Sequence, residues 1–350
     1  MRNTLRCFAL FLALVLAFGL SSCAKYPMVS SSEEEKATVF TVDGEYKAPY
    51  ELYRFAFLNA LRAKGDMNGW GEAEKKAAFD ECDAIAREEI ARIYTVFSLC
   101  EKQGIDPYSR EIDKSVEKAV ENVIDDEISG FGDHDAYLKA LRESYMNDSV
   151  FRLYMRLDIC EERLARTMQL SSFVKEDDET VKAYFMSDAT VRATWIYISY
   201  TSAAYDNHTD AMWNDLVERA KAASNEDFIA MAQGYLLGDL YHPDELEAGF
   251  YFGKHQLDAY YEALTETAFS LAEGESSELI HSGDGVYIVR RLPKDNAYIE
   301  NEENMELLRE YYLLDCFYRV IDEESERILG TLVPEAAYGG ITLDSVKMGE

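Results

Sequence analysis

The 350-residue chain has few basic residues: 35 lysines and arginines stand against 66 aspartates and glutamates, and the formal net charge is −31. A protein that binds nucleic acid needs a basic surface to neutralise phosphates. An acidic chain repels both a phosphate backbone and anionic lipid headgroups. The composition therefore excludes nucleic-acid binding and electrostatic attachment to a membrane.

Proline and histidine are also scarce, with 6 and 5 residues, and the common catalytic motifs are absent. No H-E-x-x-H, P-loop, G-x-S-x-G or G-x-G-x-x-G occurs. The histidines show no metal-ligand spacing. Acidic runs such as Glu33–Glu35 and Glu176–Glu179 are typical of solvated linkers and helix starts. We therefore expect no metal ion and no cofactor.

What the chain has in quantity is core-forming residues. Hydrophobic residues make up 48% and aromatic residues 13%, with 24 tyrosines and 17 phenylalanines. This composition is typical of a folded protein and not of a disordered acidic tail. The length predicts roughly two domains.

The N-terminus has the pattern of an export signal. Arg2 and Arg6 precede an apolar run from Cys7 to Leu20, which is too short for a comfortable membrane span. The following Leu-Ser-Ser-Cys resembles the lipobox of bacterial lipoproteins, which implies cleavage after residue 22 and diacylglycerol and palmitate on Cys23. The alternative is an ordinary signal peptide in which Cys23 is incidental. If Cys23 is lipidated, residues 23–37 form a flexible tether, and the acyl chains supply the stable anchoring.

Four cysteines follow: Cys82, Cys100, Cys160 and Cys316. They form no C-x-x-C pair, and apolar residues recur at steps of three and four around Cys82, Cys100 and Cys160, which predicts buried helix faces. We interpret all four as free structural thiols. An export signal permits disulfides, so a bridge from Cys82 or Cys100 to Cys160 stays open as an alternative.

The periodicity predicts a mainly helical α+β protein. A short strand at 39–42 with an Asp-Gly turn precedes helices at 50–64, 72–103, 109–128, 131–144, 148–169 and 178–186, with Asp133 as an N-cap. A β-branched and aromatic strand at 191–200 then opens a small α/β segment. Helices follow at 210–223 and at 227–232, the second one capped by Asn225. A loop to Phe252, a helix at 257–271 and a strand at 285–292 complete the segment. A helix from Asn301 to about 330 should pack back on the first helices, before a tail at 331–350.

This order resembles the extracytoplasmic foldases of the PrsA and SurA type. In these proteins a helical chaperone domain carries an inserted peptidyl-prolyl isomerase domain of the parvulin (PpiC) type. The resemblance places the chaperone domain at 38–189, with the C-terminal helix 294–330, and the isomerase domain at 190–293. The elements that carry the resemblance are Ala193-Thr194-Trp195-Ile196, the helix 227–232, Gly249 before an aromatic pair, the Phe-x-Leu-x-x-Gly-Glu-x-Ser stretch from Phe269, and the strand from Gly285.

The isomerase positions of the family are substituted in this chain. The resemblance puts Trp195 and Tyr287 where parvulins have two histidines, and Leu237 or Gly238 where they have cysteine or aspartate. The pocket methionine and phenylalanine fall at Tyr260 and Leu264, unless Gln256 and Leu257 occupy that stretch instead. Rotation about an X-Pro bond has a barrier of about 20 kcal/mol and needs no obligatory proton transfer. A tryptophan would nevertheless fill a proline-sized pocket, so we expect weak or lost isomerase activity.

The resemblance implies a lipid-anchored extracytoplasmic chaperone that binds unfolded or newly exported polypeptides, with the isomerase unit used mainly for binding. It is also compatible with a homodimer. One alternative is an active peptidyl-prolyl isomerase with an altered pocket. A second is a lipoprotein that binds a ligand or a dedicated partner on a borrowed fold.

Overall fold

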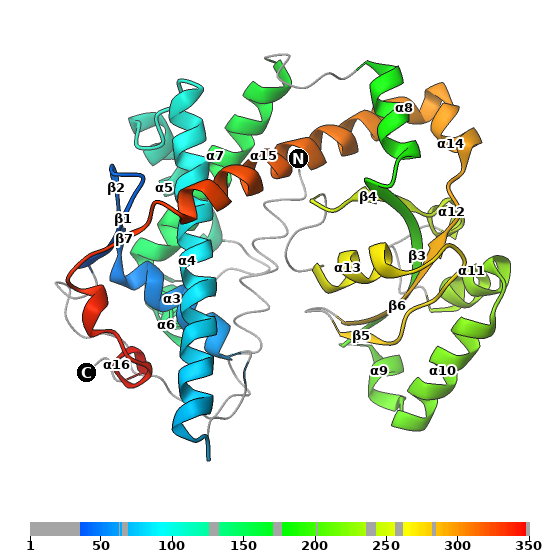
Figure 1. Ribbon diagram of the computed structural model, residues 1–350, viewed down its shortest axis with the longest axis horizontal. Coiled ribbons are helices and arrows are strands. Elements are labelled where there is room, and N and C mark those ends of the chain that lie inside the picture. Colours follow the sequence, from blue (N-terminus) through cyan, green and yellow to red (C-terminus); the bar gives the residue numbers. More distant parts are fainter. Residues whose placement is uncertain are drawn as a thin grey trace. The chain divides into compact units, whose positions relative to one another are not determined.

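The computed structural model describes residues 36–62, 64, 69–125, 133–170, 177–200, 202–235, 243–255, 262–281 and 285–347. The chain forms two compact units (Figure 1). Unit 1 comprises residues 1–167 and 320–350, and unit 2 comprises residues 168–319. The protein is of the α+β class and mainly helical, as predicted. In the described ranges no helix is long and apolar enough to span a membrane.

Unit 1 is a group of helices with a small three-stranded sheet. Its elements are β1 (Thr38–Val42), β2 (Tyr46–Pro49), α3 (Tyr50–Arg62), α4 (Glu72–Lys102), α5 (Arg110–Asp125), α6 (His134–Glu143), α7 (Asp148–Leu170), the last part of α15 (Met305–Leu329), β7 (Val333–Pro334), η3 (Tyr338–Gly340) and α16 (Leu343–Lys347). Asp43 and Gly44 both have positive φ, 49° and 76°, between β1 and β2. Two such residues are what the turn of a tight β-hairpin requires.

The long helices of unit 1 bury the faces that their sequences predict. Cys82, Ala86, Ile90, Ile93 and Phe97 of α4 are all fully buried. This stripe follows the 3.6-residue period, so burial of one helix face explains the stability of α4 better than its own helix propensity does. Asp133 caps α6 through the N–H of Ala136 at 2.7 Å, which confirms the predicted N-cap.

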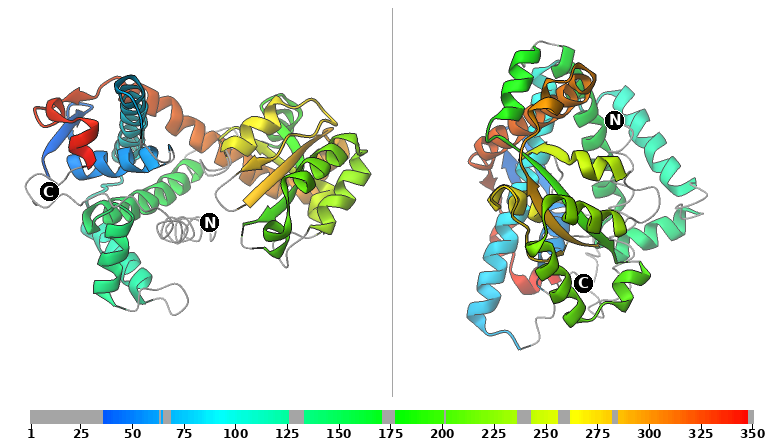
Figure 2. Two further views of the ribbon diagram at one scale, coloured as in Figure 1. Left: turned by 90° about the horizontal axis from the view of Figure 1, so that it is seen from below. Right: turned by 90° about the vertical axis from the view of Figure 1, so that its right-hand side faces the viewer.

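Unit 2 is built on a four-stranded antiparallel sheet with strand order β4-β3-β6-β5. Its elements are α8 (Asp178–Met186), β3 (Thr190–Ser199), α9 (Ala203–Asn207), α10 (Asp210–Ala222), α11 (Asn225–Gly234), α12 (Pro243–Ala248), β4 (Phe250–Gly253), α13 (Glu262–Ser270), β5 (Ile280–His281), β6 (Gly285–Leu292), α14 (Asn296–Glu300), η2 (Glu302–Asn304) and the first part of α15. Figures 1 and 2 show the yellow helix α13 on one face of this sheet and the light green helix α10 on the other.

Helices on both faces explain why β3 is apolar along most of its length. Ala193, Trp195 and Tyr197 point into the cluster with α13, whereas Ile196 and Ile198 point into the cluster with α10 and α11. A strand covered on both faces does not need polar residues at alternate positions. The sheet therefore has a core on each face, and the predicted isomerase positions that the structure describes lie on the α13 side.

Besides the short elements β2, α9, β5 and α14, which were not predicted, the structure departs from the sequence-based expectation in four respects. Residues 243–253, expected as loop, contain α12 and β4, which are too short for a periodic pattern. The expected tail contributes β7 to the sheet of unit 1 and buries Leu343 and Val346. Residues 168–189 and 294–319, grouped with the helical domain in the sequence analysis, lie in unit 2, where α8, α14 and α15 share one core.

The fourth departure is the N-cap of α11. The capping residue is Ser224, whose hydroxyl accepts a hydrogen bond from the N–H of Asp227 at 3.1 Å. Asn225 was predicted to do this, and that prediction is wrong. Its side chain instead accepts a hydrogen bond from the Nε of the buried Arg290 at 2.7 Å. Serine and asparagine are similar as caps, so the tertiary contact decides which one takes the position.

Candidate functional site

The predicted isomerase positions that the structure describes come together on one face of the sheet. Trp195 lies on β3 and Tyr287 on β6, and Leu264 reaches the same cluster from α13. The antiparallel register pairs Tyr197 with Tyr287 and Trp195 with Val289. Trp195 and Tyr287 are therefore diagonal neighbours across two paired strands. Cys23, Leu237 and Tyr260 lie outside the described residues.

Aromatic rings occupy the space in front of Trp195. Its ring stacks on Phe250 of β4, with 4.4 Å between centroids and 14° between planes. Tyr287 meets it edge-on at 6.5 Å, and Phe252 does so at 6.5 Å from the other side. Trp195 is only 7% exposed. Stacked and edge-to-face arrangements of this kind are the favourable ones for aromatic pairs.

Tyr287 is buried more deeply than Trp195. It is 1% exposed, and its ring lies 4.8 Å from that of Tyr197. Leu264, which is also 1% exposed, completes the cluster on the α13 side together with Ala268 and Leu271. The side chains at these positions thus form a packed core layer.

Little acid–base chemistry is available in this layer. Its buried members are aromatic or aliphatic, and no histidine, cysteine or carboxylate is among them. The polar side-chain groups that the strands contribute to the layer are the hydroxyls of Tyr197 and Tyr287 and the indole N–H of Trp195. A cluster of this kind can bind apolar groups and offer weak hydrogen bonds, and its described side chains include no group with a pKa near neutral pH in the unperturbed state.

Sequence reasoning used Phe250 only as part of the aromatic pair after Gly249 and missed its contact with Trp195. Phe250 lies on β4, in the segment expected as a loop, so nothing placed its ring on that of Trp195. The available signal was the run Phe250-Tyr251-Phe252, because three aromatic residues in a row are typical of a short strand.

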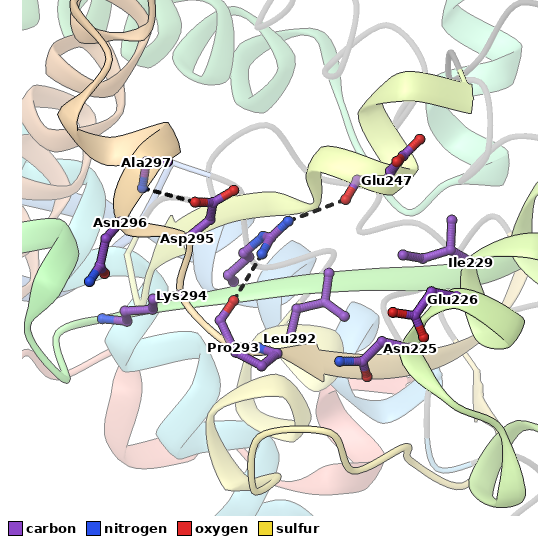
Figure 3. Close-up of a pocket in the computed structure, with 11 residues that line it drawn as sticks. Asn225, Glu226, Ile229, Glu247, Leu292, Pro293, Lys294, Asp295, Asn296 and Ala297 are labelled. Carbon is purple, nitrogen blue, oxygen red and sulfur yellow. Dashed lines mark hydrogen bonds between the residues drawn. The ribbon is translucent and has the colours of Figure 1, made fainter.

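A separate pocket of about 470 Å³ lies at the opposite end of β3 from Tyr197 (Figure 3). It is lined by Arg192, Asn225, Glu226, Ile229, Glu247, Leu292, Pro293, Lys294, Asp295, Asn296 and Ala297. The lining comes from β3, α11, α12, β6, the connection from β6 to α14 and the start of α14. None of the predicted site residues belongs to it.

The polar groups of this pocket mostly serve the fold. The Arg192 guanidinium donates to the carbonyls of Ala248 at 2.6 Å, Pro293 at 2.9 Å and Glu247 at 3.2 Å, and Figure 3 draws the last two contacts. Asp295 caps α14 through the N–H of Ala297 at 2.9 Å. The Arg192 guanidinium and the Asp295 carboxylate thus hydrogen-bond to backbone groups around the pocket. They hold chain segments together at this place instead of pointing free polar atoms at a ligand.

A buried carboxylate in unit 2 was also not predicted. Asp315 of α15 is 4% exposed, and its Oδ1 accepts the N–H of His255 at 2.9 Å. Burial, together with the neighbouring Asp315 carboxylate, raises the pKa of Tyr184 well above its usual value. Asp315 thus ties the end of β4 and α8 to α15, which is a structural task. Elsewhere in the described ranges no three histidines, cysteines or carboxylates lie close enough together to hold a metal ion.

Comparison with known proteins gives only distant structural similarity. No family model and no curated protein sequence matches the chain. Among solved structures, the foldase protein PrsA from Streptococcus pneumoniae is 16% identical, with 79% of this chain and 96% of that chain covered and a TM-score of 0.30. PrsA from Bacillus subtilis is 16% identical over 74% and 90%, with a TM-score of 0.26.

Foldase protein PrsA from Lactococcus lactis gives a similar result. It is 14% identical over 89% of this chain and 100% of that chain, with a TM-score of 0.27. Similarity at this level is too low to identify a family, a substrate or an activity for this chain.

Proposed function

We propose that the protein is an extracytoplasmic chaperone that binds unfolded or newly exported polypeptides, and that its parvulin-like unit at 190–293 binds chains with little or no prolyl isomerisation. The observation that carries this proposal is the filled cluster around Trp195 and Tyr287. Where an isomerase would hold a proline between polar groups, this chain has Phe250 stacked on Trp195 at 4.4 Å.

Catalysis of prolyl rotation requires space for the ring and a surface that stabilises the twisted imide. With Trp195 at 7% and Tyr287 at 1% exposure, a proline ring could enter only if the aromatic stack opened. Opening a packed aromatic pair forfeits roughly 0.5–1.5 kcal/mol of ring–ring contact beyond the lost burial. If the unit keeps its fold in order to bind polypeptides and has lost the catalytic pocket, Trp195 and Tyr287 can replace the two histidines of the family.

The acidity of the chain supports the binding role. A net charge of −31 keeps the chaperone soluble while it holds apolar clients, and it attracts basic unfolded chains over long range. The same charge disfavours direct adsorption to an anionic membrane. Membrane attachment in this proposal therefore depends on lipid at Cys23.

The isomerase part of the proposal is tested with a short X-Pro peptide and the full chain. We expect the cis-to-trans relaxation, which takes tens of seconds without a catalyst, to keep its uncatalysed rate. Trp213→Ala is the matched control for Trp195→Ala, because Trp213 packs against the other core of the same sheet. A strong acceleration that Trp195→Ala removes and Trp213→Ala leaves intact would overturn the proposal in favour of an active isomerase.

The anchoring part is tested by Cys23→Ala in the producing cell. Without the thiol there is no site for diacylglycerol, so we expect the variant to appear in the soluble extracytoplasmic fraction or to keep its signal peptide. Cys7→Ala is the control, because Cys7 belongs to the segment that is removed. Unchanged membrane attachment of Cys23→Ala would rule out the lipid anchor.

A further inference from the structure

Two of the four cysteines in the described ranges meet in the core of unit 1. Cys100 lies near the end of α4, and Cys160 lies in the middle of α7, 60 positions later. The Cys100 Sγ donates to the backbone carbonyl of Cys160 at 3.5 Å. Both residues are fully buried. No side chain therefore separates the two residues, although α5 and α6 lie between them in sequence.

The side chains of this pair also interact directly. The hydrogen bond with the Cys160 thiol, together with burial, raises the pKa of Cys100. The same hydrogen bond lowers the pKa of Cys160, and the guanidinium groups of Arg156 and Arg163 lower it further. In the folded chain Cys160 is thus the member of the pair that loses its proton more readily.

The other two thiols have no such neighbour. Cys82 lies on the same face of α4 as Cys100, and burial raises its pKa to about 11, with only Lys64 and Glu81 as charged neighbours. Cys316 belongs to unit 2, where its thiol contacts Tyr312. Geometry therefore singles out one pairing from those that the sequence left open.

We propose that Cys100 and Cys160 form a disulfide that joins α4 to α7 when the chain folds in an oxidising thiol–disulfide environment. The joining step needs the two sulfurs to move from contact to bonding distance, about 2.05 Å, by rotation of the cysteine side chains. The bond closes a 60-residue loop and restricts the unfolded chain, so it should stabilise unit 1.

The reaction is a thiol–disulfide exchange with a small disulfide such as oxidised glutathione. The thiolate of one cysteine of the pair attacks one sulfur of that disulfide and releases one thiolate, which leaves a mixed disulfide on that cysteine. The other cysteine then loses its proton and attacks the cysteine sulfur of the mixed disulfide, which releases the second thiolate. The cysteine pair loses two electrons, and the small disulfide gains them. Both thiols are buried in the folded state. The exchange therefore takes place during folding, while the small disulfide can still reach them.

The test is refolding of the full reduced chain in a buffer of reduced and oxidised glutathione, followed by denaturation, alkylation of remaining thiols and peptide mapping. We expect two fewer alkylated thiols than in the fully reduced chain, and a crosslinked peptide pair containing Cys100 and Cys160. Cys100→Ser and Cys160→Ser should lose this difference, whereas Cys82→Ser, the matched control on the same helix face, should keep it.

A second readout uses the wild-type chain alone, so it does not depend on whether a serine variant folds. The oxidised chain should unfold at a higher denaturant concentration than the same chain after reduction. A refolded wild-type chain with both Cys100 and Cys160 alkylated would overturn the proposal, as would a crosslink to a different cysteine. Neither result bears on polypeptide binding, which is measured separately.

Discussion

Asp158 of α7 carries an oxygen, Oδ2, that is shielded from solvent and has no hydrogen-bond partner among the described residues. Burial, with a smaller contribution from Glu161, raises its pKa to about 8. In the unfolded chain an aspartate titrates near pH 4. Between about pH 4 and pH 8, Asp158 is therefore protonated in the folded chain and ionised in the unfolded chain. The free energy of unfolding falls as the pH rises through this range.

The substitution Asp158→Asn should remove this dependence. At pH 8 we expect the variant to be more stable than the wild type by about 2 kcal/mol, since a shift of one pKa unit corresponds to about 1.4 kcal/mol and a new unpaired amide offsets part of the gain. The advantage should shrink as the pH falls towards 5. Denaturant unfolding at both pH values measures it, with the exposed Asp125→Asn as control. An advantage that does not change with pH would contradict the assignment.

Single residues were predictable from the sequence where local chemistry determines their role. The cap at Asp133 needs only its own helix, and the sequence identifies it. Ser224 and Asn225 are both good caps, and the buried Arg290 selects between them through a contact 65 positions away. The burial of Asp158 could not be predicted, because an acid beside an apolar helix stripe is usually solvated.

At the scale of elements, β3 and β6 define the sheet of unit 2, and Gly285 permits their closest approach. A Cβ at Gly285 would lie 2.5 Å from the carbonyl oxygen of Ile198 and 2.7 Å from the ring of Tyr197. A backbone atom cannot move aside as a side chain can. The glycine at the start of β6 is thus required by the paired strand and not by a turn.

Gly285→Ala should therefore lower the free energy of unfolding of unit 2 by about 2 kcal/mol through overpacking. Gly274→Ala is the comparison: no heavy atom lies within 4 Å of a Cβ there, and only its φ of 80° opposes a side chain. Its cost should be about 1 kcal/mol. Thermal unfolding followed by near-ultraviolet circular dichroism measures both, and an equal or smaller loss for Gly285→Ala would contradict the close approach.

Long elements were predictable and short ones were not. The period of 3.6 predicted α4 and α7 almost to the residue, and the β-branched run predicted β3. In contrast, α12 buries one leucine and β4 has four residues, so neither offers enough positions to show a period. These short elements supply Phe250, which fills the space at Trp195.

At the scale of the whole molecule, the sequence predicted a mainly helical α+β protein with a small sheet-containing part. It could not predict that α8, α14 and the first part of α15 lie in unit 2, because an apolar helix face shows that it is buried but not which partner buries it. The proximity of Trp195 and Tyr287 was predictable only through the family resemblance. The packing of Phe250 on Trp195 depends on β4 and required the structure.

We propose that the protein binds unfolded polypeptides without catalysing prolyl isomerisation. The most direct test is the refolding of a basic, aggregation-prone client whose slow folding phase is limited by an X-Pro bond, with and without the full chain. We expect a higher yield of native client at low salt and an unchanged slow phase, with a time constant of roughly 10–100 s. An unchanged yield, or a slow phase accelerated in proportion to the amount of chain added, would contradict it.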